Sequence, residues 1–202
     1  EVHWSEVPGR DEKWKEQTIK NTSESQFQTE FECEFLGSID TLINATKLKT
    51  MAIVDPKRSP DGLDVYEMPK KNHTYVTTVD VARGVNNDYS AFIVFDATQA
   101  PYKIVAKYRN SDIKPIVFPN ILKKISDYYN KAYVLIEIND LGQQVADSMQ
   151  FELEYDNMMM VTQRGRAGQV LGGGFSGRGN QLGLRMTKGT KKIGTSNLKS
   201  LI

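Results

Sequence analysis

The sequence predicts an α/β fold built on a central mixed sheet, and two observations support this prediction. From His73 onward, β-rich runs and amphipathic helical runs follow one another in the order strand, strand, strand, helix, strand, helix, strand. Two of the strand runs are strongly apolar and yet carry a carboxylate, Asp80 in the first and Glu137 in the fourth. Because strands hold their side chains at fixed spacing, these acids indicate a site built on the sheet itself.

The residues before this pattern form two further regions. The first 50 residues are predicted to be helical and amphipathic, with Ser23 and Ser25 as start signals for one helix. Their apolar anchors are Trp4, Trp14, Ile19, Phe27, Phe31 and Phe35. Residues 55–73 are rich in turn-forming Pro, Gly, Asp and Asn and are predicted to be a linker. We therefore expect a helical region at 1–54, a linker at 55–73 and an α/β domain at 74–202.

The α/β domain is expected to open with an antiparallel meander. Three β-rich runs at residues 75–81, 91–96 and 102–108 are separated by short turn segments. A helix should begin at about Pro119, because proline suits the first turn of a helix. The residues predicted to share one face of this helix are Ile121, Leu122, Ile125, Tyr128 and Tyr129.

The second half of the domain continues with a strand at residues 133–139. Asp140 is predicted to cap the next helix, with Gln143 at its third position. That helix has Leu141, Val145, Met149 and Leu153 at helical spacing. Residues 158–162 are predicted to form the last strand. This order of elements is that of the ribonuclease H-like fold, whose first and fourth strands are neighbours, so it brings Asp80 and Glu137 together across 57 positions.

The acidic pair predicts a metal site. A carboxylate within a run such as that at 134–138 is costly to bury without a partner. A hard divalent cation such as Mg²⁺, which prefers oxygen ligands, removes that cost. Two acids on adjacent strands could hold cations that stabilise the attacking and leaving oxygens of a phosphodiester displacement, so Asp80 and Glu137 are the predicted catalytic and metal-binding residues of a nuclease.

Other polar residues near these strands allow two interpretations each. Asp88 is a candidate additional metal ligand, but Asn87-Asp88 also fits a hairpin turn. Arg83 beside Gly84 could contact a phosphate or could simply be solvated. His3 and His73 are expected to be structural.

The charge is distributed unevenly along the chain. The formal net charge is +1, yet residues 161–202 hold eight basic and no acidic residues, which leaves −7 for the first 160. A basic segment of this kind favours a polyanionic partner, and the residues predicted to contact DNA are Arg83, Arg164, Arg166, Arg178, Lys188, Lys191 and Lys192. The glycine-rich stretch at 164–179 is predicted to be a flexible basic loop or a long hairpin beside the site, with a tether that has no DNA role as the alternative.

Composition excludes several classes of protein. A single cysteine, Cys33, rules out an internal disulfide, and one Cys with two distant His residues disfavours a structural zinc site. No apolar run approaches the roughly 18 residues of a membrane span, and no signal peptide is visible. We therefore expect a cytoplasmic protein without a membrane partner.

Several runs resemble one family in the order that the family has them. Residues 14–19 (WKEQTI) and 27–43 (FQTEFECEFLGSIDTLI) resemble the segment that closes the ATPase domain of large terminase subunits of tailed bacteriophages. Residues 78–91 (TVDVARGVNNDYSA) and 134–139 (VLIEIN) resemble the first and second nuclease motifs of that family. Residues 187–202 (TKGTKKIGTSNLKSLI) resemble the segment before its last strand and helix. The resemblance covers nearly the whole chain and is closest to the terminases of large contractile-tailed phages.

The resemblance implies an endonuclease that cuts concatemeric double-stranded DNA during genome packaging in the host cytoplasm. It implies Mg²⁺ or Mn²⁺ as cofactor, and DNA, a portal protein, a small terminase subunit and the ATPase domain of the full-length subunit as partners. No phosphate-binding loop of the Gly-x-x-x-x-Gly-Lys-Ser/Thr type occurs, so ATP is expected only in the full-length protein. The family's third metal-binding carboxylate would follow Ile202, so this chain is expected to be a fragment with weak or no activity.

Two hypotheses from other classes remain open from the sequence. An actin-like or sugar-kinase ATPase shares the three-strand start, but it would place glycine where this chain has Ala82 and would not need Glu137. A non-enzymatic nucleic-acid-binding module would explain the basic tail and leave the two acids unexplained.

Overall fold

The computed structural model describes residues 3–31, 43, 45–58, 60–84, 88–164, 170–174 and 181–201. The chain forms two compact units. The helical unit comprises Glu1–Ile53 and Thr195–Ile202, and the sheet unit comprises Val54–Gly194. Among the described residues, no helix is long and apolar enough to cross a membrane.

The helical unit contains a 3₁₀ turn at Trp4–Glu6 and the helices α1 (Glu12–Asn21), α2 (Glu24–Glu30) and α3 (Ala45–Thr50). The predicted start signal at Ser23 is confirmed, because its hydroxyl accepts a hydrogen bond from the backbone N–H of Gln26. Four of the predicted aromatic anchors, Trp4, Trp14, Phe27 and Phe31, form one cluster of ring contacts. Phe35 lies outside the described residues.

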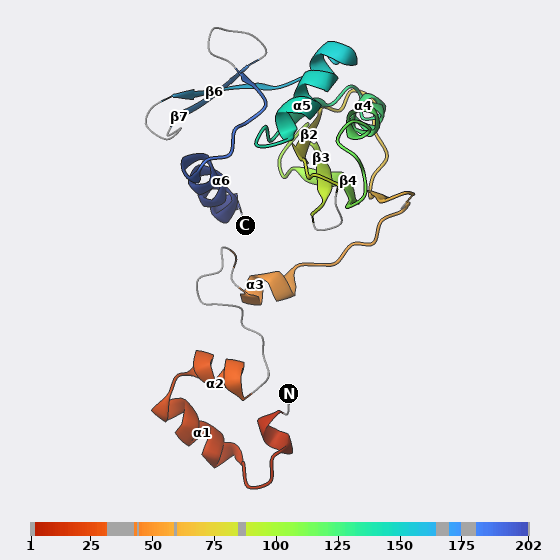
Figure 1. The fold of residues 1–202 in the computed structure, drawn as a ribbon. Helices are drawn as coiled ribbons and strands as arrows, with labels where there is room; N and C mark the ends of the chain where they lie inside the picture. The colour runs from red at the N-terminus through yellow and green to blue at the C-terminus, as the bar shows by residue number, and fades with distance from the viewer. Residues whose placement is uncertain are drawn as a thin grey trace. The chain divides into compact units, whose positions relative to one another are not determined.

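The sheet unit is built on five strands in the order β1-β4-β3-β2-β5. Figure 1 labels the neighbouring strands β2, β3 and β4 of this sheet. The bounds are β1 (Leu63–Val65), β2 (Tyr75–Asp80), β3 (Ser90–Asp96), β4 (Lys103–Asn110) and β5 (Tyr133–Ile136). The strands β2, β3 and β4 form the predicted antiparallel meander, and β5 joins β2 in parallel. The predicted fold is confirmed, including the adjacency of the first and fourth predicted strands.

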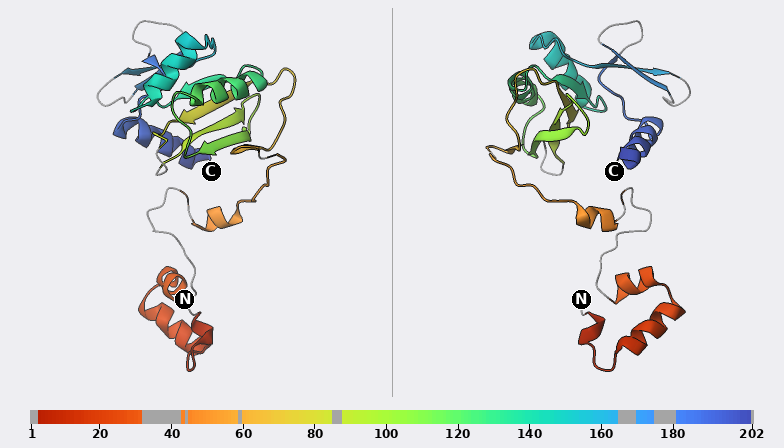
Figure 2. Two further views of the ribbon diagram at one scale, coloured as in Figure 1. Left: turned by 45° about the vertical axis from the view of Figure 1, so that its right-hand side comes forward. Right: turned by 180° about the vertical axis from the view of Figure 1, so that it is seen from behind.

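Helices cover one face of this sheet (Figure 2). They are α4 (Phe118–Tyr128) and α5 (Gly142–Asp147), the latter continued by a π-helical turn at Ser148–Glu152. The ring of Phe118 packs on those of Phe92 and Tyr108, and the side chains that alternate with them in each strand face the opposite side. The core between sheet and helices thus fixes which side chains of β2 and β5 remain accessible.

Three elements differ from the prediction. The segment predicted as a linker contributes β1, which pairs with β4 at the edge of the sheet. The predicted last strand is β6 (Met160–Arg164), and it lies in a second sheet between β7 (Val170–Gly174) and β8 (Gln181–Leu182), joined to β5 by a parallel bridge from Met158 to Val134. Asp140 is not the cap of α5, because its backbone φ is +49° and the helix begins at Gly142 without a side-chain cap.

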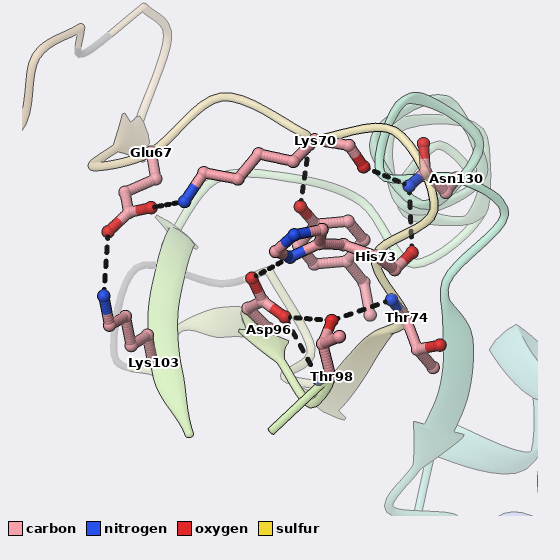
Figure 3. A network of polar contacts seen from close by, with 9 residues as sticks. Glu67, Lys70, His73, Thr74, Asp96, Thr98, Lys103 and Asn130 are labelled. Atoms are coloured by element: carbon pink, nitrogen blue, oxygen red, sulfur yellow. Dashed lines mark hydrogen bonds and ion pairs between the residues drawn. The ribbon is translucent and has the colours of Figure 1, made fainter. Parts of the chain in front are cut away.

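A polar network fixes the end of the sheet where β2 begins (Figure 3). The imidazole Nδ1 of His73 and the Asp96 carboxylate are 2.7 Å apart, and that carboxylate also accepts hydrogen bonds from the hydroxyl and backbone N–H of Thr98. The side-chain amide of Asn130 donates to the backbone oxygens of Lys70 and His73. His73 therefore has an acidic partner, Asp96, and this network lies at the opposite end of β2 from Asp80.

Candidate metal centre

The two predicted catalytic acids lie side by side at the carboxyl ends of parallel strands. The last register pair of β2 and β5 joins Val79 to Ile136, and the backbone N–H of Glu137 donates to the oxygen of Val79 at 2.9 Å. Val79 and Ile136 are buried under the helices, so the next residues, Asp80 and Glu137, both face the opposite side of the sheet. Asp80 is exposed and Glu137 is partly buried.

Both acids line a cavity of about 320 Å³ on that open face. Its other walls are largely apolar and include Leu135 beside Glu137 and Ile93 on β3, with Leu184 and Met186 completing the rim. Burial in this setting raises the pKa of the Glu137 carboxyl, and the negative charge of Asp80 raises it further. The positive charge of Lys191 acts in the opposite direction on the same pKa. The acids are thus close enough to repel each other, which is the arrangement that a bound cation relieves.

Two glycines allow the backbone to close tightly around Glu137. A Cβ on Gly142 would lie 1.8 Å from the backbone oxygen of Glu137. Gly183 has a φ of +74°, and a Cβ there would lie 2.3 Å from the backbone oxygen of Ile136. Any side chain at either position would therefore displace the strand that carries Glu137.

The segment after Gly183 is attached directly to the end of β5. Leu184 donates its N–H to the oxygen of Ile136 at 2.8 Å and accepts from the N–H of Ile138 at 3.0 Å. The side-chain amide of Asn139 donates to the backbone oxygen of Met186, and its oxygen accepts from the Met186 N–H. Gly142, Gly183 and Asn139 were not predicted as site residues, because their roles depend on contacts that no local pattern reveals.

Comparison with known protein families shows which family the sheet unit resembles. Residues 77–202 match the family described as the terminase RNaseH-like domain. The chain belongs to this family. The resemblance to large terminase subunits is thereby confirmed, as are the predicted ribonuclease H-like fold and the predicted function as the nuclease part of such a subunit. The kinase-like alternative and the non-enzymatic module lose their support, while the contractile-tailed phage type stays a prediction.

Solved structures of terminase nucleases share the fold. The chain is similar to the large terminase nuclease from the thermophilic phage G20c with bound magnesium, with a TM-score of 0.58, 19% identity, and coverage of 82% of this chain and 71% of that chain. The same nuclease with bound cobalt gives a TM-score of 0.53 and 21% identity, with coverage of 74% of this chain and 64% of that chain. With bound zinc it gives a TM-score of 0.52 and 21% identity, with coverage of 74% of this chain and 70% of that chain.

Asp88, the other predicted metal ligand, lies just before β3, and its role as a ligand stays a prediction. Its carboxylate accepts a hydrogen bond from the N–H of Tyr89, as a turn residue does. Within the described ranges, no group of three or more His, Cys, Asp and Glu side chains is placed to hold a metal ion. Asp140, expected to be a helix cap, instead accepts from the guanidinium of Arg83 at 2.8–2.9 Å, and both side chains are exposed. Arg83 therefore has an acidic partner in this structure.

The predicted DNA-binding residues lie in different parts of the terminase domain. Lys188, Lys191 and Lys192 occupy the first turns of α6 (Lys188–Leu201), whose start is held by hydrogen bonds between Thr187 and Thr190. Lys191 is near enough to influence Glu137. The backbone of Arg164 ends β6, whereas Arg166 and Arg178 lie outside the described residues. Their DNA contacts stay predictions.

Proposed function

We propose that this chain cleaves double-stranded DNA as the metal-dependent endonuclease part of a phage large terminase subunit. The observation that supports this most strongly is the placement of Asp80 and Glu137 on neighbouring parallel strands, over a cavity on the open face of the sheet. Family membership supplies the nuclease context.

The residues present fit a divalent cation. Two carboxylates that repel each other, one of them partly buried, form a hard oxygen donor set, and the positive charge of Lys191 only partly offsets the rise in the pKa of Glu137. We propose Mg²⁺ or Mn²⁺ as the cofactor, and the similar nucleases with bound magnesium, cobalt and zinc are consistent with a divalent ion. When bound, such ions would favour ionisation of the attacking water and neutralise charge on the departing 3′ oxygen.

The residues around the acidic pair each have a defined task in this proposal. Asp80 and Glu137 hold the cations at the carboxyl ends of β2 and β5, and Gly142 and Gly183 allow the backbone to hold Glu137 in place. The apolar walls of the cavity limit water on one side of the acids, which strengthens electrostatic interactions there. Lys191 adds a positive charge next to the acids, where it can attract a phosphate.

We further propose the cellular role that the family implies. The substrate is concatemeric DNA, cut when packaging starts and ends in the host cytoplasm. The partners are the portal protein, the small terminase subunit and the ATP-hydrolysing domain of the longer subunit. Low sequence specificity is expected because contacts to phosphates carry no direct sequence information.

The test combines metal binding with DNA cleavage. We expect the unmodified chain to bind Mn²⁺ in a calorimetric titration, and Asp80→Asn and Glu137→Gln to abolish that binding while retaining the far-UV circular dichroism spectrum. Nicking of a supercoiled plasmid in Mg²⁺ or Mn²⁺, where it occurs, should vanish with the same two variants. Asp156→Asn, at an exposed acid near the opposite end of β5 from Glu137, is the matched control and should change neither readout. Equal Mn²⁺ binding by all four proteins would refute the proposal.

A further inference from the structure

An arginine that none of the predictions included lies in the same cross-strand row as the acidic pair. Asp80 on β2 pairs with Ala91 on β3, and Ala91 pairs with Arg109 on β4. Residues paired across a sheet point to the same face, so Arg109 shares the open face with Asp80. Two strand spacings of about 4.8 Å separate them by about 10 Å. Among the described residues Arg109 forms no ion pair with Asp80, and it is near enough to contact the same extended ligand.

The guanidinium of Arg109 is held by an aromatic ring. Its Cζ lies 3.6 Å from the centroid of the Tyr89 ring. Within the described part of the chain Arg109 makes no ion pair, whereas Lys107, two residues earlier on β4, pairs with Asp64. A guanidinium stacked on a ring keeps its N–H donors around the rim of its plane, where they can reach a phosphate.

The backbone beneath Arg109 is fixed as well. Its N–H donates to the oxygen of Gly62 at 3.1 Å, next to the β1–β4 pairing. Gly62 has a φ of +82°, and a Cβ there would lie 2.8 Å from the oxygen of Arg109. Tyr89 and Gly62 together place this cation on an inner strand of the sheet and not on a mobile loop.

The space between the cation and the acids is open to a ligand. The residue between them is Ala91, which adds one methyl group to the face and lines the cavity that Asp80 and Glu137 share. Lys191 supplies a second positive charge close to Glu137. Each acid therefore has a positive charge within reach of the same extended ligand.

We propose that Arg109, stacked on Tyr89, binds a phosphate next to the phosphate at which the DNA is cut. Both phosphates belong to the same DNA strand, which crosses the sheet over Ala91. This inference rests on the proposed nuclease function and adds the path of its substrate. The nucleic-acid backbone is the partner that the geometry favours, because its phosphates recur along one direction as the charges on this face do. Arg109 is a positioning residue that acts on the substrate at a distance from the cleaved bond.

The salt dependence of DNA binding tests this proposal on the whole chain in EDTA, which prevents cleavage. Each phosphate contact contributes about 0.9 to the slope of log K against log salt, so Arg109→Gln should lower the slope by about 0.9. This change in slope equals about an eightfold loss of affinity at 0.1 M salt. The loss becomes smaller as the salt concentration rises and disappears on extrapolation to 1 M. Arg109→Lys keeps the charge and should keep the slope. The probe is fluorescence anisotropy of two labelled duplexes of different sequence, which should respond equally.

Two further variants separate the path from the charge. Ala91→Leu adds bulk without changing charge and should weaken binding at every salt concentration with an unchanged slope. Arg10→Gln, which removes another arginine stacked on a ring (4.5 Å from the Trp14 centroid), is the matched control and should leave both affinity and slope unchanged.

The outcomes distinguish this inference from the nuclease proposal. An unchanged slope for Arg109→Gln, or an equal drop for Arg10→Gln, would overturn the role of Arg109 while Asp80-dependent Mn²⁺ binding still supported the nuclease. An unchanged affinity for Ala91→Leu would overturn the path over Ala91. Absence of Mn²⁺ binding in the unmodified chain would instead refute the nuclease proposal itself.

Discussion

Replacing Asp80 with Asn should stabilise the metal-free chain and remove its response to divalent cations. In the absence of metal, the Asp80 charge adds to burial in raising the pKa of Glu137. When folding raises the pKa of a carboxyl, the folded chain loses stability as the pH rises from the pKa of the unfolded state, about 4.3, through the pKa of the folded state. At neutral pH the whole cost is present. The variant should therefore show a smaller fall of stability across this pH range.

The expected gain follows from the geometry of the two strands. Adjacent strands lie about 4.8 Å apart, and two unit charges at about 4 Å repel by about 1 kcal/mol in water. Because Asp80 is exposed, solvent and salt screen this repulsion, so we expect the variant to gain about 0.5–1 kcal/mol in EDTA. The unmodified chain should gain about 2.7 kcal/mol at a Mn²⁺ concentration of 100 times Kd, and Asp80→Asn should gain almost nothing.

The assay must report on the sheet unit alone. Both tryptophans, Trp4 and Trp14, belong to the helical unit, so tryptophan fluorescence would follow the wrong transition. Urea unfolding monitored by tyrosine fluorescence follows the sheet unit, because all nine tyrosines lie between Tyr66 and Tyr155, with Asp156→Asn as the control. A destabilised Asp80→Asn chain in EDTA would show that Asp80 is a structural acid. Equal stabilisation of variant and parent by Mn²⁺ would show that the metal binds elsewhere.

Three further predictions concern other parts of the chain. Gly142→Ala should destabilise the sheet unit by about 3 kcal/mol in urea and weaken Mn²⁺ binding, because its Cβ would overlap the Glu137 oxygen; full retention of both would contradict the tight approach. Burial alone would raise the pKa of Asp96, but hydrogen bonds from Thr98 and His73 outweigh burial and lower it. Its contribution is therefore present above the ordinary carboxyl pKa and lost as the pH falls below it, so Asp96→Asn should cost about 1–3 kcal/mol at pH 7 and flatten the acid limb of a stability curve measured by circular dichroism. Replacing three arginines of the basic segment with Ala should lower the DNA salt slope by about 0.9 for each phosphate contact that is lost, and an unchanged slope would show that these arginines do not bind DNA. Those arginines are Arg164, Arg166 and Arg178.

The parts of the fold that the sequence predicted are those governed by local periodicity. The alternation in β2 and β3 places Val79 and Phe92 toward the helices and Asp80 and Ala91 on the other face, which a period of two residues is enough to reveal. The pairing of β2 with β5 followed from the order of the elements. The adjacency of Asp80 and Glu137 was therefore predictable without any tertiary contact.

The errors arose where distant contacts outweigh local signals. Turn-forming residues around 55–73 concealed β1, a strand of three residues that is stabilised by its pairing with β4. Asp140 fits a helix cap by type, but its backbone adopts a positive φ and its carboxylate binds Arg83, which is 57 positions away in sequence. A local pattern contains no information about a partner so far along the chain.

The same reasoning explains why Arg109 and the glycines around Glu137 escaped prediction. In sequence, Arg109 is one cation among 26 lysines and arginines, and only the register of β2, β3 and β4 aligns it with Asp80. Gly142 and Gly183 are ordinary loop glycines until the backbone oxygens of Glu137 and Ile136 are placed against them. Periodicity identifies which strands carry the acids, whereas the contacts between strands determine how firmly Glu137 is held and which cation shares its face. The residues most informative about substrate binding are thus those whose meaning depends on sheet register, and Arg109→Gln tests that dependence directly.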